Sequence, residues 1–174
     1  MDTLTNFIAP WYAQLKFLHV ISVAMWSFST AVAYRDYIVP AFKSVERHPA
    51  DEARIARRND FMERFDSGVI LEHVAFPLLV VTGLCMMLAG GWSLDSLTWF
   101  SVKILIVVLV FVPIEIVDYY ISHFGGQKAR IRRSGDMKRY ERYMAIHWTF
   151  FKITAPLIVV FIPTVYYLAI VKPF

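Results

Sequence analysis

The chain has 174 residues, of which 57% are apolar and only 18% are charged, and its mean hydropathy is +0.49. A soluble domain of this length normally carries more charge and shorter apolar runs, so the composition excludes an ordinary globular protein and predicts a single membrane domain over residues 1–174. The formal net charge of +4 comes from basic residues that flank apolar segments, which indicates membrane lipids as their partners and does not indicate nucleic acid.

Four apolar segments are long enough to cross a hydrocarbon core of about 30 Å, which takes roughly 20 helical residues. No alternation typical of strands competes with helix in these segments, and a helix satisfies its own backbone in lipid. The sequence therefore predicts an all-α integral membrane bundle of four transmembrane helices. The chain start lacks the basic region of a secretory signal, so the first segment is expected to stay in the mature protein. The predicted spans cover about 9–34, 68–90, 99–123 and 144–170.

The loops between these segments predict the orientation. Loops 43–66 and 124–142 together carry thirteen Lys and Arg residues, whereas loop 91–98 carries none. By the positive-inside rule, both long loops are cytoplasmic and both termini face outward. Because the first long loop mixes acids with bases, we expect a solvated helix on the cytoplasmic face there, and we expect the second loop at anionic headgroups. The predicted outer-interface tryptophans are Trp11, Trp92 and Trp99.

The first segment carries a polar stripe, because steps of three or four residues place its polar side chains on one helix face. A lysine and a histidine inside such a segment are costly unless they face a partner, a cavity or a cofactor. At 1.5 Å per residue His19 lies near the midplane and cannot reach water, whereas Lys16, one turn outward, can snorkel to the headgroups. The stripe consists of Tyr12, Lys16, His19, Val23, Trp26, Thr30 and Tyr34, followed by Arg35.

The remaining polar residues of the spans fall at two depths. Lys103 lies about 6 Å below the outer surface, so it can either converge with Lys16 or snorkel outward. A second group, rich in imidazole and carboxylate, lies toward the inner side of the membrane. Its members are Glu72, His73, Glu115, Asp118, His123 and His147.

These residues predict a haem site built on His19. Neutral imidazole is the commonest axial ligand of haem iron in helical bundles. Lys16 offers a cation for a porphyrin carboxylate, and Trp26 offers an aromatic wall on the same helix face. A second iron ligand would have to come from another span, where His73 is nearest in depth and His147 is next.

Two alternatives stay open for the inner polar group. Glu115 and Asp118 stand at i and i+3 on one helix, and with Glu72 and neighbouring histidines they resemble the ligands of dinuclear iron or manganese sites, although the repeated Glu-x-x-His pattern is absent. Because Cys85 is the only cysteine, a cysteine-based zinc or iron–sulfur site is excluded. In the second alternative, the two carboxylates of the third span neutralise charge between helices. Their candidate partners are Lys152, His147 and Arg35.

Several short motifs, in the right order along the chain, resemble those of one membrane protein family. They are Leu15-Lys16-Phe17-Leu18-His19 with Trp26 and Tyr34-Arg35, then Met62-Glu63-Arg64, Trp99-Phe100-Ser101-Val102-Lys103 and Ile170-Val171-Lys172-Pro173-Phe174. The chain thereby resembles the HemJ-type protoporphyrinogen oxidases and their CopD-like relatives. The resemblance implies a bundle of four or five helices in the inner membrane that binds haem b and oxidises protoporphyrinogen IX, with a quinone or the respiratory chain as electron acceptor.

Carried over by position, the resemblance implies that His19 is the haem ligand or catalytic histidine, with Lys103, Trp26 and Arg35 as its partners. The chain departs from the family in having Ile114-Glu115 where a histidine is usual. A non-enzymatic b-type cytochrome subunit of a larger electron-transfer complex is therefore the alternative function. A membrane protein that handles copper or di-iron is the second alternative. Further copies of the chain or other membrane subunits are the expected protein partners.

Overall fold

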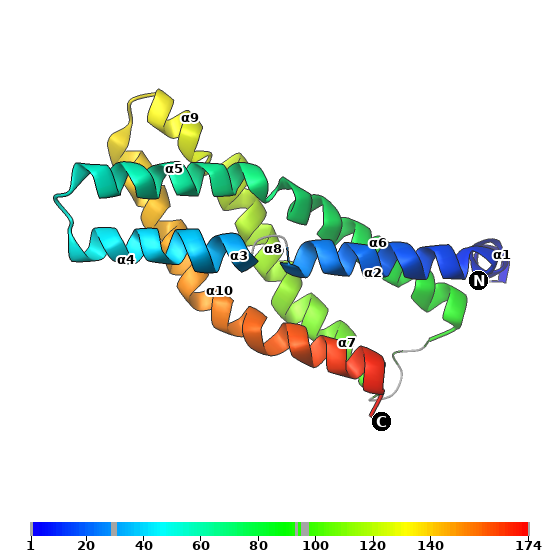
Figure 1. Cartoon of the computed structure of the whole chain (residues 1–174). Coiled ribbons are helices and arrows are strands. Elements are labelled where there is room, and N and C mark those ends of the chain that lie inside the picture. Colours follow the sequence, from blue (N-terminus) through cyan, green and yellow to red (C-terminus); the bar gives the residue numbers. More distant parts are fainter. Residues whose placement is uncertain (1, 29–30, 93, 95–97, 174) are drawn as a thin grey trace.

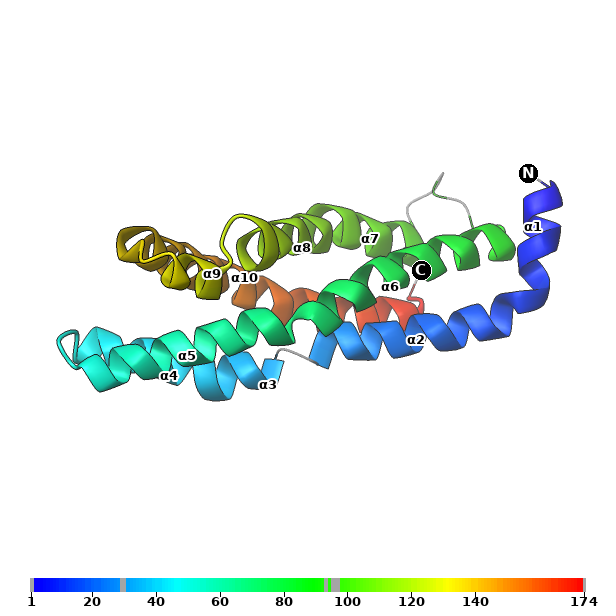
Figure 2. The ribbon, with the colours of Figure 1, turned by 90° about the horizontal axis from the view of Figure 1, so that it is seen from above.

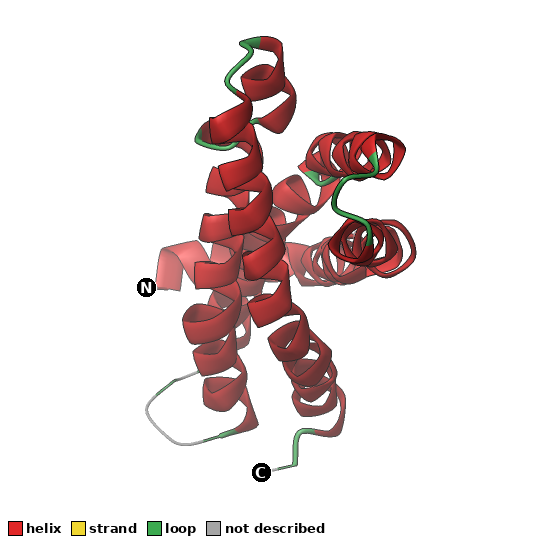
Figure 3. Cartoon of the chain, turned by 90° about the vertical axis from the view of Figure 1, so that its left-hand side faces the viewer, coloured by secondary structure: helices red, strands yellow, loops and turns green. Residues whose placement is uncertain are grey.

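The computed structural model describes residues 2–28, 31–92, 94 and 98–173, and it describes side chains from Thr5 onward. Within these ranges the chain is helical and contains no strand, so the all-α prediction is confirmed (Figure 3). Four of its helical rods are long and apolar enough to cross a membrane, which indicates a multi-pass membrane protein (Figure 1). The rods run over Thr5–Arg47, Glu52–Gly90, Trp99–Arg133 and Met137–Val171.

Both marked ends of the chain lie at one end of the bundle, as Figures 1 and 2 show. Trp92 and Trp99 meet at the same end, with ring centroids 6.0 Å apart, and the Lys172 ammonium lies 5.2 Å from the Trp99 ring. The opposite end holds the turn at 48–51 and the basic helix that follows Gln127, and it is called the basic end from here on. That the basic end faces the cytoplasm remains a prediction from the charge rule.

The first rod changes its helical pitch before a proline. Its π-helical turn η2 ends at Ile38, two residues before Pro40, and a similar turn in the third rod ends at Phe111, two residues before Pro113. A wider turn lets the helix continue where proline has no N–H to donate. The elements of the first rod are α1 (Asp2–Ile8), η1 (Ala9–Trp11), α2 (Tyr12–Phe28), α3 (Ala31–Ala33), η2 (Tyr34–Ile38) and α4 (Val39–Arg47).

The other three rods begin at capped N-termini. Asp51 accepts the backbone N–H of Arg54 at 3.1 Å, which lowers the pKa of its exposed carboxyl and caps the second rod. Thr98 and Asp136 cap the third rod and the last helix in the same way. The remaining elements are α5 (Glu52–Gly68), α6 (Ile70–Gly90), α7 (Trp99–Ile106), η3 (Val107–Phe111), α8 (Val112–Tyr119), η4 (Tyr120–Phe124), α9 (Lys128–Arg133) and α10 (Met137–Val171).

The predicted loops 43–66 and 124–142 are largely helical in the structure. Rather than lying flat on the membrane, α5 leads into α6 and packs beside α4, so the first two rods form one long hairpin (Figure 2). The Glu52–Gly90 rod has 39 residues, or about 58 Å at 1.5 Å per residue, which is far more than the roughly 30 Å of the hydrocarbon core. We therefore expect part of the bundle to extend beyond the membrane, and the charge of the basic end indicates that end as the part outside.

Two clusters of buried apolar side chains hold the rods together. The span core joins α2, α6 and η3, and the basic-end core joins α4, α5, α9 and α10. The span core consists of Trp26, Ala75, Phe76, Leu79 and Phe111. The basic-end core consists of Ile38, Phe42, Met62, Phe65, Val69, Ile131, Tyr140, Met144 and Phe151.

Gly126 lies where the third rod turns toward the basic end, and a side chain cannot be accommodated there. A Cβ at this position would lie 2.2 Å from the Ile121 carbonyl oxygen and 2.7 Å from the Tyr143 ring. We expect Gly126→Ala to lower the free energy of unfolding by about 1–3 kcal/mol, the usual cost of overpacking. Gly68→Ala is the matched control, because a Cβ there has no neighbour within 4 Å. Thermal unfolding of both purified variants in the same detergent checks this, and equal midpoints would contradict it.

Candidate functional site

His19 is oriented by two oxygen atoms of α6. Its Nδ1 lies 3.0 Å from the Leu79 carbonyl oxygen and 3.0 Å from Thr82 Oγ1. The carbonyl can only accept, and the Thr82 hydroxyl already donates to the Leu78 carbonyl at 2.7 Å. The proton of a neutral His19 ring therefore belongs on Nδ1, which leaves the Nε2 lone pair for another partner.

The surroundings of His19 leave room for the imidazole and supply a nearby cation. A Cβ at Gly83 would lie 3.1 Å from His19 Cε1, so a side chain there would press on the ring. Lys103, on α7, is half-buried and lies close enough to His19 for a direct charge interaction. Lys16 is exposed on the same helix as His19. Thr30, the inner member of the predicted stripe, lies outside the described residues.

Trp26 and Glu115 join the first and third rods inside the span core. Trp26 Nε1 donates to Glu115 Oε1 at 2.7 Å, and both residues are at least nine-tenths buried. The indole also packs against Phe76 and Phe111, with ring centroids 5.4 and 4.9 Å away. This hydrogen bond links Trp26, a predicted site residue, to Glu115, which the sequence predicts as a metal ligand or as a neutralising charge.

Asp118, on α8, lies between two imidazoles from different rods. Its Oδ1 is 3.2 Å from His147 Nε2 and its Oδ2 is 3.3 Å from His73 Nε2. Both nitrogen atoms are buried, and within the described residues neither has an aligned hydrogen bond. Asp118 also accepts the Ser122 hydroxyl at 3.3 Å.

The His147 side of this cluster continues into a buried ion pair at the basic end. Lys128 Nζ donates to both oxygens of Asp66 at 2.9 Å and to His147 Nδ1 at 2.7 Å. Lys128 and His147 are both fully buried. Because an ammonium can only donate, His147 Nδ1 accepts, and the proton of a neutral His147 lies on Nε2 facing Asp118.

The His73 side of the cluster runs toward the surface of the bundle. His73 Nδ1 lies 2.8 Å from His123 Nε2, so one of the two nitrogens donates to the other. His123, in η4, is only partly buried, whereas His73 and Asp118 are at least nine-tenths buried. An imidazole that contacts a partner at each nitrogen can take up a proton at one and release a proton from the other. The sequence Asp118–His73–His123 is called the histidine path from here on.

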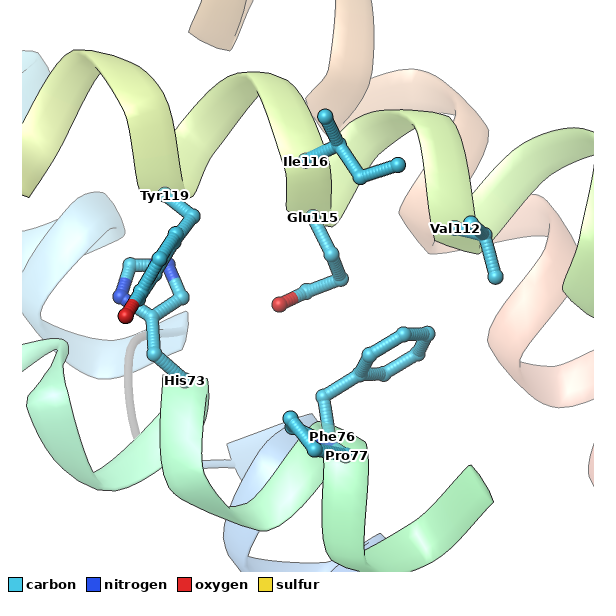
Figure 4. Close-up of a pocket in the computed structure, with 7 residues that line it drawn as sticks. All are labelled: His73, Phe76, Pro77, Val112, Glu115, Ile116 and Tyr119. Carbon is cyan, nitrogen blue, oxygen red and sulfur yellow. The ribbon is translucent and has the colours of Figure 1, made fainter. Parts of the chain in front are cut away.

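Two cavities adjoin these groups. The central cavity, of about 320 Å³, lies between the four rods and has Trp26, Glu72, Glu115 and Asp118 on its wall. A side cavity of about 310 Å³ lies between α6 and α8, where Glu115 points between Phe76 and the His73–Tyr119 pair (Figure 4). Glu115 therefore lines both cavities. His19 lines neither of them.

The predicted site residues thus separate into two levels. His19 bonds Leu79 on α6, and His73 stands six residues before Leu79 on the same helix. The level of His73 is therefore about 9 Å along α6 from the level of His19. His73 and His147, the predicted second iron ligands, both contact Asp118 in this structure. The predicted neutralising pair of Asp118 with His147 is present, whereas Arg35 pairs with its neighbour Asp36 at 2.8 Å.

Lys152 contacts neither predicted carboxylate partner, and two residues of the cluster were not expected in the site. Lys152 lies over the Trp148 ring, 5.7 Å from its centroid. The sequence places Asp66 and Lys128 in the predicted cytoplasmic loops and predicts lipid headgroups as the partners of Lys128. In the sequence, these two residues are marked only as an acid and a base at the ends of separate apolar runs. A single sequence does not show that such residues form an ion pair.

Comparisons with known proteins do not assign the chain to a family, because no family model, curated protein or solved structure gives a significant match. Among the described residues, no group of three or more His, Cys, Asp or Glu side chains is arranged to hold a metal ion. The contacts described above therefore carry the functional interpretation.

Proposed function

We propose that the protein is a haem b-binding oxidoreductase of a bacterial inner membrane, with His19 as an axial ligand of the haem iron and its basic end in the cytoplasm. The observation that carries the proposal is the bond of His19 Nδ1 to the Leu79 carbonyl. A ligating histidine usually donates its other N–H to such an acceptor, which fixes the tautomer and the ring orientation. The contact leaves His19 Nε2 as the atom for iron.

Two lysines around His19 offer cations for porphyrin carboxylates. Lys103 lies close to His19, and its ammonium would pair with a porphyrin carboxylate. Lys16 is a second cation for this purpose on the same helix. Bound haem would supply a one-electron Fe(III)/Fe(II) couple. This pair of His19 and Lys103 is the one that the resemblance to HemJ-type proteins implies.

The buried Asp118 cluster favours an oxidoreductase that exchanges protons over a cytochrome subunit that carries only electrons. Ionisable residues inside a membrane are costly and commonly mark proton relays. Here such residues extend from the central cavity to the partly exposed His123. The specific reaction that we propose, by resemblance, is the oxidation of protoporphyrinogen IX.

A visible spectrum of the purified protein tests the haem proposal. In protein from cells grown with ample iron, we expect a Soret band and, after reduction, the α band of haem b. His19→Ala should abolish or shift these bands because it removes the ligand. His48→Ala, at an exposed histidine in the turn of the first hairpin, should leave them unchanged.

Absence of the bands in wild-type protein would overturn the haem proposal, and an unchanged spectrum of His19→Ala would overturn the ligand assignment. Growth of a strain that lacks protoporphyrinogen oxidase then separates the two functions. Rescue supports the enzyme, and failure to rescue with intact haem bands supports the cytochrome subunit.

A further inference from the structure

We propose that the side cavity binds the ammonium group of a lipid-soluble primary amine, with Glu115 as its counter-ion. The site is separate from His19, so the inference goes beyond the proposed redox function and does not depend on it. At about 310 Å³, the cavity is at the small end of the range for small-molecule sites, which suits an amine with one ring or a short chain. Its wall includes Ile116, which is 64% exposed, so a ligand can enter sideways from the lipid.

Glu115 is a buried carboxylate that has no counter-charge among the described residues. It is 8% exposed, and its Oε1 accepts Trp26 Nε1 at 2.7 Å, whereas Oε2 has no hydrogen bond or ion pair within the described part of the chain. The charged side chains that interact with it, Glu72 and Asp118, are carboxylates as well. Because an unpaired ionised group inside a membrane is costly, this carboxylate calls for a cation.

The basic side chains near Glu115 are committed elsewhere. Arg35 lies on the wall of the central cavity, but its guanidinium pairs with Asp36 at 2.8 Å and its side chain is 80% exposed. His73 shares the side cavity with Glu115, but both of its ring nitrogens face other partners along the histidine path. The positive charge that Glu115 lacks therefore has to come from a ligand.

The wall of the side cavity offers the groups that an ammonium needs, and it contains no Lys or Arg. Glu115 points into the cavity between Phe76 and Tyr119, whose ring faces attract a cation (Figure 4). Pro77 has no N–H to donate to the His73 carbonyl one turn earlier, and both residues line the cavity. This carbonyl and Glu115 Oε2 are two acceptors for the N–H groups of a primary ammonium.

Other ligand classes fit this wall less well. A hard metal cation takes about six oxygen ligands, which the wall does not supply. A neutral alcohol could form the hydrogen bonds but would leave the carboxylate charge unpaired, and a quaternary ammonium has no N–H. Glu115 stands eight residues before His123, the inner end of the predicted span, or about 12 Å inside it. A free amine reaches this depth more easily than the ammonium of a lipid headgroup.

Titration calorimetry with 4-phenylbutylamine tests this inference on the whole protein in phosphatidylcholine nanodiscs. We expect saturable binding of the amine and no saturable binding of 4-phenylbutanol, its neutral analogue. Glu115→Gln keeps the shape of the side chain and should weaken amine binding at least tenfold. Ile116→Trp narrows the cavity from an exposed position and should do the same. Val117→Trp, at the next exposed position and on the wall of neither cavity, should leave binding unchanged.

The outcomes separate this inference from the haem proposal. Saturable amine binding without haem bands would overturn the haem proposal alone, and haem bands without saturable amine binding would overturn this inference alone. Equal affinity for the amine and the alcohol would also overturn it. So would an unchanged amine affinity in Ile116→Trp, which serves as the readout if Glu115→Gln does not fold. Loss of amine binding when the nanodiscs contain phosphatidylethanolamine would assign the site to a lipid headgroup and overturn the assignment to a free amine.

Discussion

Lys128→Met is expected to lower the free energy of unfolding by about 3–5 kcal/mol, the cost of removing one partner of a buried ion pair. Lys128 is fully buried, and it bonds both oxygens of Asp66 and His147 Nδ1. Without the ammonium, the Asp66 carboxylate keeps its desolvation cost and loses its counter-charge. The midpoint of thermal or denaturant unfolding in detergent measures the loss.

Two further variants make the Lys128 prediction specific. Arg64→Met breaks an exposed pair with Asp60 and should cost at most about 1 kcal/mol, because water screens such pairs. The double variant Lys128→Met, Asp66→Leu removes both buried charges and should recover most of the stability. If the double variant is no more stable than Lys128→Met alone, the unpaired Asp66 charge is not the cause of the loss.

Trp26→Ala is expected to lower the free energy of unfolding by about 3–5 kcal/mol, as large-to-small changes in well-packed cores do. The indole is 8% exposed and packs against Phe76 and Phe111. Trp26→Phe keeps most of the ring but removes the donor to Glu115, and we expect it to cost about 1–3 kcal/mol. The difference between the two variants, measured as unfolding midpoints in one detergent, separates packing from the hydrogen bond.

Trp11→Ala is the control for Trp26, because the Trp11 side chain is 57% exposed. Because this position is away from buried contacts, the free energy of unfolding of Trp11→Ala should stay within about 0.5 kcal/mol of that of the wild type. A loss in Trp11→Ala as large as that in Trp26→Ala would show that detergent contact, rather than the span core, sets the effect.

Much of the fold can be predicted from the sequence because lipid imposes a simple requirement on it. Long apolar runs must be helical there, so the four spans follow from hydropathy alone. The length of the rods at the basic end is harder to predict. The charged segment around α5 is helical by pattern, but its direct continuation into α6 depends on Met62 and Phe65 packing against other rods.

The candidate site shows where prediction from one sequence ends. Position along a span gives depth, so the common level of His73, Asp118 and His147 can be predicted. The sequence does not predict which helix faces which, because the pairing of rods is set by side-chain packing across the bundle. The sequence therefore leaves open whether Asp118 pairs with Lys152, His147 or Arg35.

His19 illustrates the same limit at a finer scale. Its midplane depth marks it as a residue that needs a partner, whether or not the chain resembles any family. The tautomer depends on Leu79 and Thr82, which are sixty or more positions away in the chain. Apolar and hydroxyl residues of a span carry no pattern that predicts this contact.

The two cores of the bundle are assembled in different solvents. Most of the basic-end core lies in rods that extend beyond the hydrocarbon, where the burial of apolar side chains is driven by water. The span core lies in lipid, which is as apolar as the side chains themselves, so its helices associate through close packing and bonds such as that of Trp26 with Glu115. Urea weakens burial from water, so it acts first on the basic end and leaves the helices in the bilayer intact.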